Sequence, residues 1–168
     1  MRIAVTGTPG TGKTSATEAL ETDLEVVHLN EVIEAEGLTT GRDEERDTLV
    51  ADLDAVEAWL DGRDDVVVES HLAHLLPVDR VVVLRCHPEE LERRLEARGE
   101  PQATIEENAE SEALDLILAE AVDRHGEAAV YEIETTDLDP SAVAAAIEAV
   151  VAGEREPSSG TVSYVEYL

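Results

Sequence analysis

The chain of 168 residues contains no phenylalanine, one tryptophan, one methionine and one cysteine. A lone cysteine, Cys86, excludes an internal disulfide. No stretch approaches the roughly 20 consecutive apolar residues that a membrane-spanning helix needs, so we expect no membrane segment. The chain begins directly with a strand pattern, and we therefore expect no signal peptide.

Basic residues are also scarce, because 12 Lys and Arg face 40 Asp and Glu and leave a net charge of −28. Such a charge is typical either of disordered acidic segments or of proteins that work in concentrated salt. Leu, Ile and Val make up 44 residues, about 26%, which is above the roughly 20% below which highly charged chains fail to collapse. The composition therefore predicts a folded cytoplasmic protein of a halophile, with no basic surface for direct binding of nucleic acid.

What the chain does contain is an alternation of short apolar segments with helical patterns. It predicts an α/β fold, with a doubly wound, five-stranded parallel sheet and helices on both faces. The predicted strands are 3–5, 26–29, 66–68, 81–84 and 130–133, and the predicted helices are 13–21, 31–36, 44–60, 88–98, 105–124 and 141–151. We expect one domain over residues 1–153; the tail, 154–168, is either disordered, an added edge strand or a clamp over a ligand.

A phosphate-binding loop is the most specific motif. Residues 7–14 read GTPGTGKT and match G-x-x-x-x-G-K-[ST] between a predicted strand and a predicted helix. Backbone amides of such a loop surround phosphate oxygens, the lysine reaches the β- and γ-phosphates, and the hydroxyl ligates Mg²⁺. The motif predicts ATP and Mg²⁺ as cofactors, bound by Thr8, Pro9, Gly10, Thr11, Gly12, Lys13, Thr14 and Ser15.

Two polar residues follow the third predicted strand. Glu69 stands where P-loop proteins place an acid beside the metal shell, so we expect Thr14 and Glu69 to serve the metal and Glu69 to be catalytic. His71 is a candidate to sense the γ-phosphate or to adjust the attacking group. The alternative is that both are polar residues at a strand end that face solvent.

Arginines are concentrated between residues 80 and 98. Arg94 and Arg98 are four residues apart, on one face of a predicted helix, and can stabilise a transferring phosphoryl group, with Arg98 also binding ATP. The alternative is a pair of surface ion pairs with Glu90 and its neighbours, which is the role we expect for Arg93.

Another charged stretch, residues 42–47, lies between the second and third predicted strands. Arg42 or Arg46 can hold a monophosphate there, or the stretch can be the solvated start of a helix.

Together the P-loop, the acidic stretch 43–47, the segment from Val66 to His71 and RLEARG at 94–99 resemble one family. It is the archaeal and eukaryotic nuclear-type adenylate kinase family, whose members also assist maturation of the small ribosomal subunit. The resemblance covers residues 1–150 and implies a three-layer nucleoside-monophosphate-kinase fold with a short helical lid. It further implies ATP as donor, AMP or another nucleoside monophosphate as acceptor, ATPase activity and a small-subunit ribosomal protein as partner.

Three functions remain open at this point. The first is an adenylate kinase that transfers the γ-phosphoryl group of Mg-ATP to AMP, with Lys13, Glu69, His71, Arg94 and Arg98 as catalytic residues. The second is an ATP-driven switch in ribosome assembly, and the third is a different small-molecule kinase on the same fold.

The charge generates a prediction about stability. We expect the protein to lose structure in dilute buffer and to regain it in concentrated KCl, because salt screens the repulsion among its carboxylates. Thermal melts followed by circular dichroism, at low salt and at about 2 M KCl, measure the effect, and NaCl is the control for cation-specific binding. Equal stability at both salt concentrations would contradict the salt-adaptation hypothesis.

Overall fold

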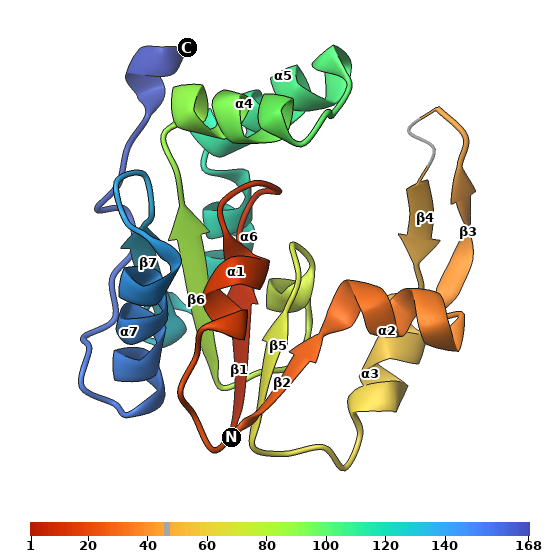
Figure 1. Cartoon of the computed structure of the whole chain (residues 1–168). Coiled ribbons are helices and arrows are strands. Elements are labelled where there is room, and N and C mark those ends of the chain that lie inside the picture. The colour runs from red at the N-terminus through yellow and green to blue at the C-terminus, as the bar shows by residue number, and fades with distance from the viewer. Residues whose placement is uncertain (46–47) are drawn as a thin grey trace.

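The computed structural model describes residues 1–45 and 48–168 and confirms the predicted parallel sheet. Figure 1 shows its strands at the centre of the molecule, between two layers of helices. In spatial order the strands are β2 (Glu25–His28), β5 (Val66–Glu69), β1 (Arg2–Thr6), β6 (Arg80–Arg85) and β7 (Val130–Glu134). All four neighbouring pairs are parallel, so the carboxyl ends of the strands meet at one edge.

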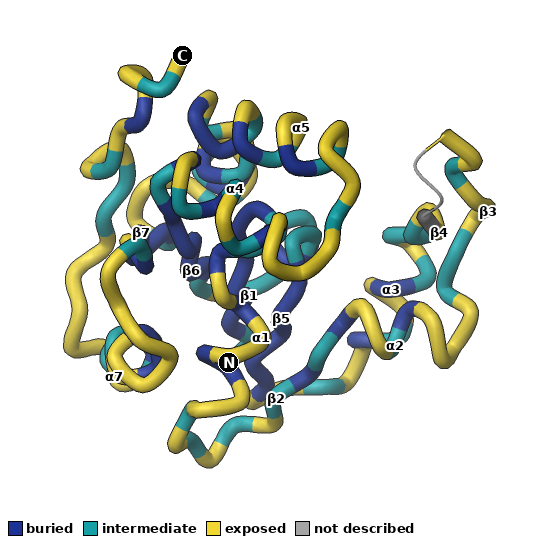
Figure 2. Tube along the Cα trace, turned by 45° about the horizontal axis from the view of Figure 1, so that its top comes forward, coloured by how far each residue is buried: buried dark blue, intermediate teal, exposed yellow. Residues whose placement is uncertain are grey.

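The central strands are apolar because both of their faces are covered (Figure 2). Along β1, Ile3 and Val5 pack with helices α1 (Lys13–Glu18) and α7 (Pro140–Val151). Ala4 faces the opposite layer, which contains α2 (Leu29–Glu36), α3 (Leu53–Leu60) and α6 (Leu116–His125). Valine, isoleucine, leucine and alanine thus form most of the core, without phenylalanine.

The predicted helix over 44–60 is wrong in its first half. In place of a helix over 44–60, a hairpin of β3 (Thr39–Asp43) and β4 (Thr48–Ala51) precedes α3. The helix begins only after Asp52, whose side chain caps it by accepting a hydrogen bond from Ala55 N at 3.1 Å. Arg63 follows α3 by three residues, and its guanidinium carbon lies 4.0 Å from the ring centroid of Trp59, which is on the helix. The hairpin projects from the body as an arm (Figure 1).

The predicted helix over 105–124 is also wrong in one respect, since it is two helices, α5 (Gln102–Ala113) and α6. Asp115 interrupts it with a left-handed backbone, φ 55°. Helices α4 (Pro88–Ala97) and α5 form a compact hairpin above the sheet edge, the short helical lid that the resemblance implies. A buried apolar cluster of Cys86, Leu91, Leu95 and Ile105 lies beneath it. We call this hairpin the lid.

The break at Asp115 is tied to a buried arginine. Arg85, at the end of β6, is 1% exposed and binds three carboxylates. Its nitrogens lie 3.2 Å from Glu112, 2.5 Å from Asp115 and 2.9 Å from Glu132. We call these four residues the Arg85 cluster; it joins two sheet strands to the base of the lid.

The tail is folded against this cluster. Ser158 pairs with β7 through a parallel bridge to Tyr131, and Thr161 donates two hydrogen bonds to Glu132. The ring of Tyr164 lies 5.3 Å from the Arg85 guanidinium carbon, and the hydroxyl of Tyr167 donates to Glu92 of the lid. None of the helices in the described part of the chain has the length and apolar character needed to span a bilayer.

The Arg85 cluster generates a prediction. We expect Arg85→Met to reduce the free energy of unfolding by about 3–5 kcal/mol, because it leaves buried carboxylates without a counter-charge. Urea unfolding in molar KCl measures the loss. Arg93→Met removes the same charge from an exposed side chain and should change the free energy by less than about 0.5 kcal/mol. Equal losses in the two variants would refute the role of the cluster.

Candidate active site

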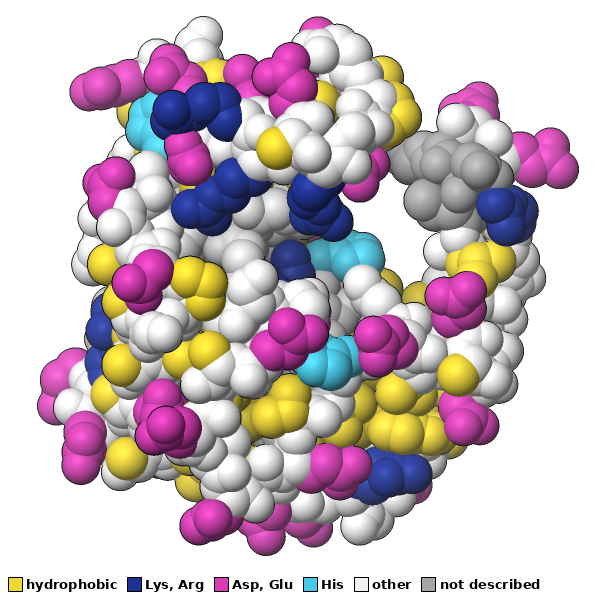
Figure 3. Space-filling model, in the orientation of Figure 1, with side chains coloured by type: hydrophobic (Ala, Val, Ile, Leu, Met, Phe, Trp, Pro, Cys, Tyr) yellow, Lys and Arg dark blue, Asp and Glu magenta, His cyan; other side chains and the backbone are white. Residues whose placement is uncertain are grey.

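A cavity of about 760 Å³ opens at the carboxyl edge of the sheet, beneath the lid. Figure 3 shows Lys and Arg side chains gathered around this hollow, whereas Asp and Glu side chains are spread over the rest of the face. The P-loop forms its floor, because the loop leaves β1 at this edge and enters α1. In a chain of charge −28 this is a local site for an anion.

The P-loop contains a glycine, Gly10, at the point where the lid packs against the loop. Gly10 has φ 95°, and a Cβ atom at this position would lie 2.8 Å from Cδ1 of Leu91 and 3.0 Å from Cδ2 of Leu95. A side chain here would therefore strain the backbone and displace the side chains of Leu91 and Leu95. The contact between the loop and the lid thus favours glycine at residue 10.

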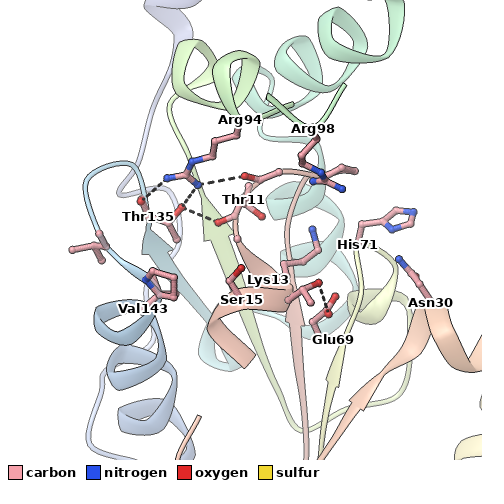
Figure 4. Close-up of a pocket in the computed structure, with 16 residues that line it drawn as sticks. Thr11, Lys13, Ser15, Asn30, Glu69, His71, Arg94, Arg98, Thr135 and Val143 are labelled. Atoms are coloured by element: carbon pink, nitrogen blue, oxygen red, sulfur yellow. Dashed lines mark hydrogen bonds between the residues drawn. The ribbon is translucent and has the colours of Figure 1, made fainter. Parts of the chain in front are cut away.

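The Lys13 side chain points into the cavity from the start of α1 (Figure 4). Its Nζ donates to the carbonyl oxygen of Thr8 at 3.2 Å. Burial lowers the pKa of the ammonium to about 8, although the nearby Glu69 carboxylate opposes the shift. The ammonium thus remains largely charged at neutral pH and has no direct ion pair with a described residue, so it is available to a phosphate.

Glu69, at the end of β5, meets Thr14 in front of the lysine. Oε1 of Glu69 accepts hydrogen bonds from the Thr14 hydroxyl at 3.0 Å and from Nδ1 of His28 at 3.0 Å. His28 ends the neighbouring strand β2 in register with Glu69. A hydroxyl and a carboxylate are hard oxygen donors that suit Mg²⁺.

The far side of the cavity, toward the arm, is lined by Asn30 and His71. Burial lowers the pKa of His71 to about 4, and the Lys13 charge acts in the same direction. The imidazole is therefore neutral at pH 7 and can offer a hydrogen bond but no positive charge. Asn30 accepts a hydrogen bond from Ser70 at 2.8 Å, which fixes its amide at the rim.

Arg94 and Arg98 reach different parts of the cavity (Figure 4). Arg94 donates to the carbonyl oxygens of Gly10 at 3.3 Å and Thr135 at 3.0 Å, and to Glu90 at 3.4 Å. The side chain of Arg98 makes no hydrogen bond or ion pair with any residue in the described part of the chain, and its guanidinium lies above Lys13. The ion pair to Glu90 exists for Arg94, and Arg93 pairs with the same carboxylate, as predicted.

The side of the cavity next to β7 is apolar. Leu138, Pro140 and Val143 line it, together with Thr135, whose hydroxyl donates to the carbonyl of Thr11 at 3.0 Å. The cavity thus joins a cationic floor to an apolar wall, which is the pattern of a nucleotide site.

Comparison with known proteins agrees with this geometry. The family model described as AAA domain matches residues 3–115. A protein of Natronomonas pharaonis named "Putative adenylate kinase" is 67% identical over the full length of both chains. Relatives with the same name are 59% identical in Halobacterium salinarum, over the full length of both chains, and 43% in Methanothermobacter thermautotrophicus, over 99% of this chain and 98% of that one. The chain belongs to this family of archaeal proteins named "Putative adenylate kinase".

Solved structures with low sequence identity share the fold of this family member. Shikimate kinase from Bacteroides thetaiotaomicron has a TM-score of 0.59 at 19% identity, with 90% of this chain and 98% of that chain covered. A gluconokinase from Sinorhizobium meliloti has a TM-score of 0.54 at 21% identity, with 90% and 93% covered. These likenesses establish the P-loop kinase fold.

The structure brings nearly all of the predicted site residues to this one cavity. They are Pro9, Gly10, Thr11, Gly12, Lys13, Thr14, Ser15, Glu69, His71, Arg94 and Arg98. Thr8 is the exception, because its side chain is buried behind the loop against Glu112. Arg42 lies on β3 away from the cavity lining, and Arg46 is outside the described residues.

Sequence reasoning missed His28, Asn30, Glu112 and Thr135. His28 carried a usable signal, since it ends a predicted strand, as Glu69 does, and strand ends meet at one edge. No sequence signal pointed to Glu112 or Thr135, because their positions depend on how the lid and β7 pack against the P-loop.

The separation of the two arginines generates a prediction. Arg94→Ala should lower the melting temperature by about 3–8 °C and weaken ATP binding, because it removes charged hydrogen bonds to two loops. Arg98→Ala should leave the melting temperature unchanged and reduce turnover instead. Thermal melts and ATP-binding titrations separate the two effects, with Arg93→Ala as control. If both variants lose the same thermal stability, the distinction is wrong.

Proposed function

We propose that this protein is a cytoplasmic, ATP-dependent adenylate kinase that transfers the γ-phosphoryl group of Mg-ATP to AMP. The proposal is supported by the relatives' name and by the cavity, which combines a P-loop, a carboxylate beside Thr14 and an arginine with no partner among the described residues. An oxygen of the AMP phosphate bonds to the γ-phosphorus as the bond to the β–γ bridging oxygen breaks, which yields two ADP.

The residues divide this work by position. P-loop amides and Lys13 hold the ATP phosphates, with Thr8, Pro9, Gly10, Thr11, Gly12, Thr14 and Ser15 as the remaining loop residues. Arg98 meets charge on the transferring group, and Arg94 holds the loops that frame the nucleoside. His71, neutral at pH 7, and Asn30 face the acceptor side.

The oxygen donors fit a metal that arrives with its nucleotide. In the described residues no group of three His, Cys, Asp or Glu side chains is arranged to hold a metal ion by itself. Thr14 and Glu69 would hold Mg²⁺ only together with phosphate oxygens and water, as is usual for this ion. When bound, Mg²⁺ neutralises charge that develops between the β- and γ-phosphates.

The observation that carries the proposal is that the Lys13 ammonium faces open space in the cavity. The ammonium faces an open volume bounded by Arg98 and His71, and this volume leads toward the arm. A nucleotide on the P-loop would therefore present its terminal phosphate to a second ligand.

The experiment is ADP production from Mg-ATP with AMP, GMP, CMP or UMP in molar KCl. We expect turnover that depends on AMP, and Lys13→Met should reduce it roughly 100-fold or more while the melting temperature stays close to wild type. The arginine variant Lys13→Arg is the matched control for charge and should also fail, because a guanidinium does not replace the compact ammonium. Turnover by Lys13→Met at the wild-type rate would sink the assignment.

A second candidate is an ATPase that acts in maturation of the small ribosomal subunit. The charge of −28 supports a basic ribosomal protein as its partner rather than RNA. Hydrolysis without any monophosphate, stimulated by such a protein, would favour this function over the kinase. The same charge supports adaptation to a concentrated-salt cytoplasm.

A further inference from the structure

The buried side chain of Thr8 links the lid to the P-loop. Thr8 is 2% exposed, and its hydroxyl donates to Oε1 of Glu112, on α5, at 3.0 Å. Glu112 is 3% exposed, so the bond is shielded from water. A hydroxyl bound to a buried carboxylate is held more firmly than one bound to a neutral acceptor.

The two oxygens of Glu112 have different partners. Oε2 accepts from Nε of Arg85 at 3.2 Å and from the backbone nitrogen of Cys86 at 2.8 Å. These bonds fix the carboxylate to the end of β6. Oε1 is thereby aimed at the P-loop, and Thr8 is the partner that it finds there.

The carbonyl of the same residue holds the lysine. The oxygen of Thr8 accepts from Nζ of Lys13 at 3.2 Å, from the backbone nitrogen of Thr11 at 3.2 Å and from the Thr11 hydroxyl at 2.8 Å. The position of Thr8 therefore sets both the curl of the loop and the place where the ammonium rests.

From this chain of contacts we propose that Glu112 is a positioning residue that acts through Thr8 on Lys13 and so couples the seating of α5 to phosphate binding. The inference rests on the proposed function for its kinetic consequence, because an effect on turnover requires that the ammonium act on the phosphates of ATP. Its structural consequence, the ordering of Lys13, is independent of that function. The competing role for Glu112 is that of a counter-charge for Arg85 and nothing more.

Thr8→Val tests the link without substituting any residue of the Arg85 cluster. Valine has the shape of threonine but cannot donate to Glu112, whereas Thr8→Ser keeps the hydroxyl. Thr8→Ala, which removes the hydroxyl without a methyl group facing the carboxylate, is the second variant if valine prevents folding. Glu132→Gln is the matched control, since Glu132 binds Arg85 in the same cluster but makes no contact with the P-loop.

Lys13 is the chain's single lysine, so protein labelled with ¹³C-lysine gives one Cε signal, which reports this residue directly. In nucleotide-free protein in molar KCl, we expect Thr8→Val to shift this signal and to increase the mobility of the side chain. Thr8→Ser and Glu132→Gln should retain the wild-type signal, even where Glu132→Gln lowers the melting temperature.

Kinetics provide the second measurement. Thr8→Val should lower kcat by about tenfold to hundredfold, with a smaller change in the KM for ATP, because misplacement of a catalytic group acts mainly in the transition state. Thr8→Ser should restore most of the rate.

Two results would overturn the proposal. One is a wild-type lysine signal and kcat in Thr8→Val and Thr8→Ala. The other is a change of the lysine signal in Glu132→Gln that equals the change in Thr8→Val, which would make the effect one of general stability. If the wild-type protein makes no ADP, the proposed function fails, whereas the lysine signal still decides the role of Glu112.

Discussion

The burial of one guanidinium constrains the rest of the structure. Arg85 lies at the end of a central strand and cannot reach water, so its charge must be matched inside the protein. Glu112 and Asp115 come from the junction of the lid with α6, and Glu132 comes from β7. In an acidic chain carboxylates are plentiful, but these three are placed by topology, and their placement fixes where the lid and the tail join the sheet.

Hydrogen bonds connect this cluster to the P-loop, at the carboxyl edge of the sheet. One oxygen of Glu112 is committed to β6, and the other reaches the P-loop. The lid also contacts the loop through Arg94 and through the leucines that lie over Gly10. The P-loop side of the cavity is thus built from three elements that hold one another, whereas the arm is an excursion of the chain between α2 and α3.

The sheet and the P-loop could be predicted from sequence because their signals are local. Apolar segments of three or four residues, such as 66–68, and the glycine spacing of residues 7–14 can both be recognised within a short window of sequence. The arm could not be predicted in this way. The sequence of residues 48–50 fits either a strand or a helix, and only the structure shows that Asp52 caps α3 and so marks the start of the helix. Asp115 likewise breaks a helical pattern for a reason that lies 30 residues away, in Arg85. Contacts of this kind are tertiary, and no window of sequence contains them.

The stacking of Trp59 on Arg63 gives the molecule a built-in optical reporter. The chain has one tryptophan, and it lies near the end of α3 and not in the lining of the cavity. Indole emission depends on the polarity and the cations around the ring, so intrinsic fluorescence of this protein reports on one place, where Trp59 packs against the core and Arg63. Light absorbed at one residue can therefore follow the loss of this packing in time, with no dye attached.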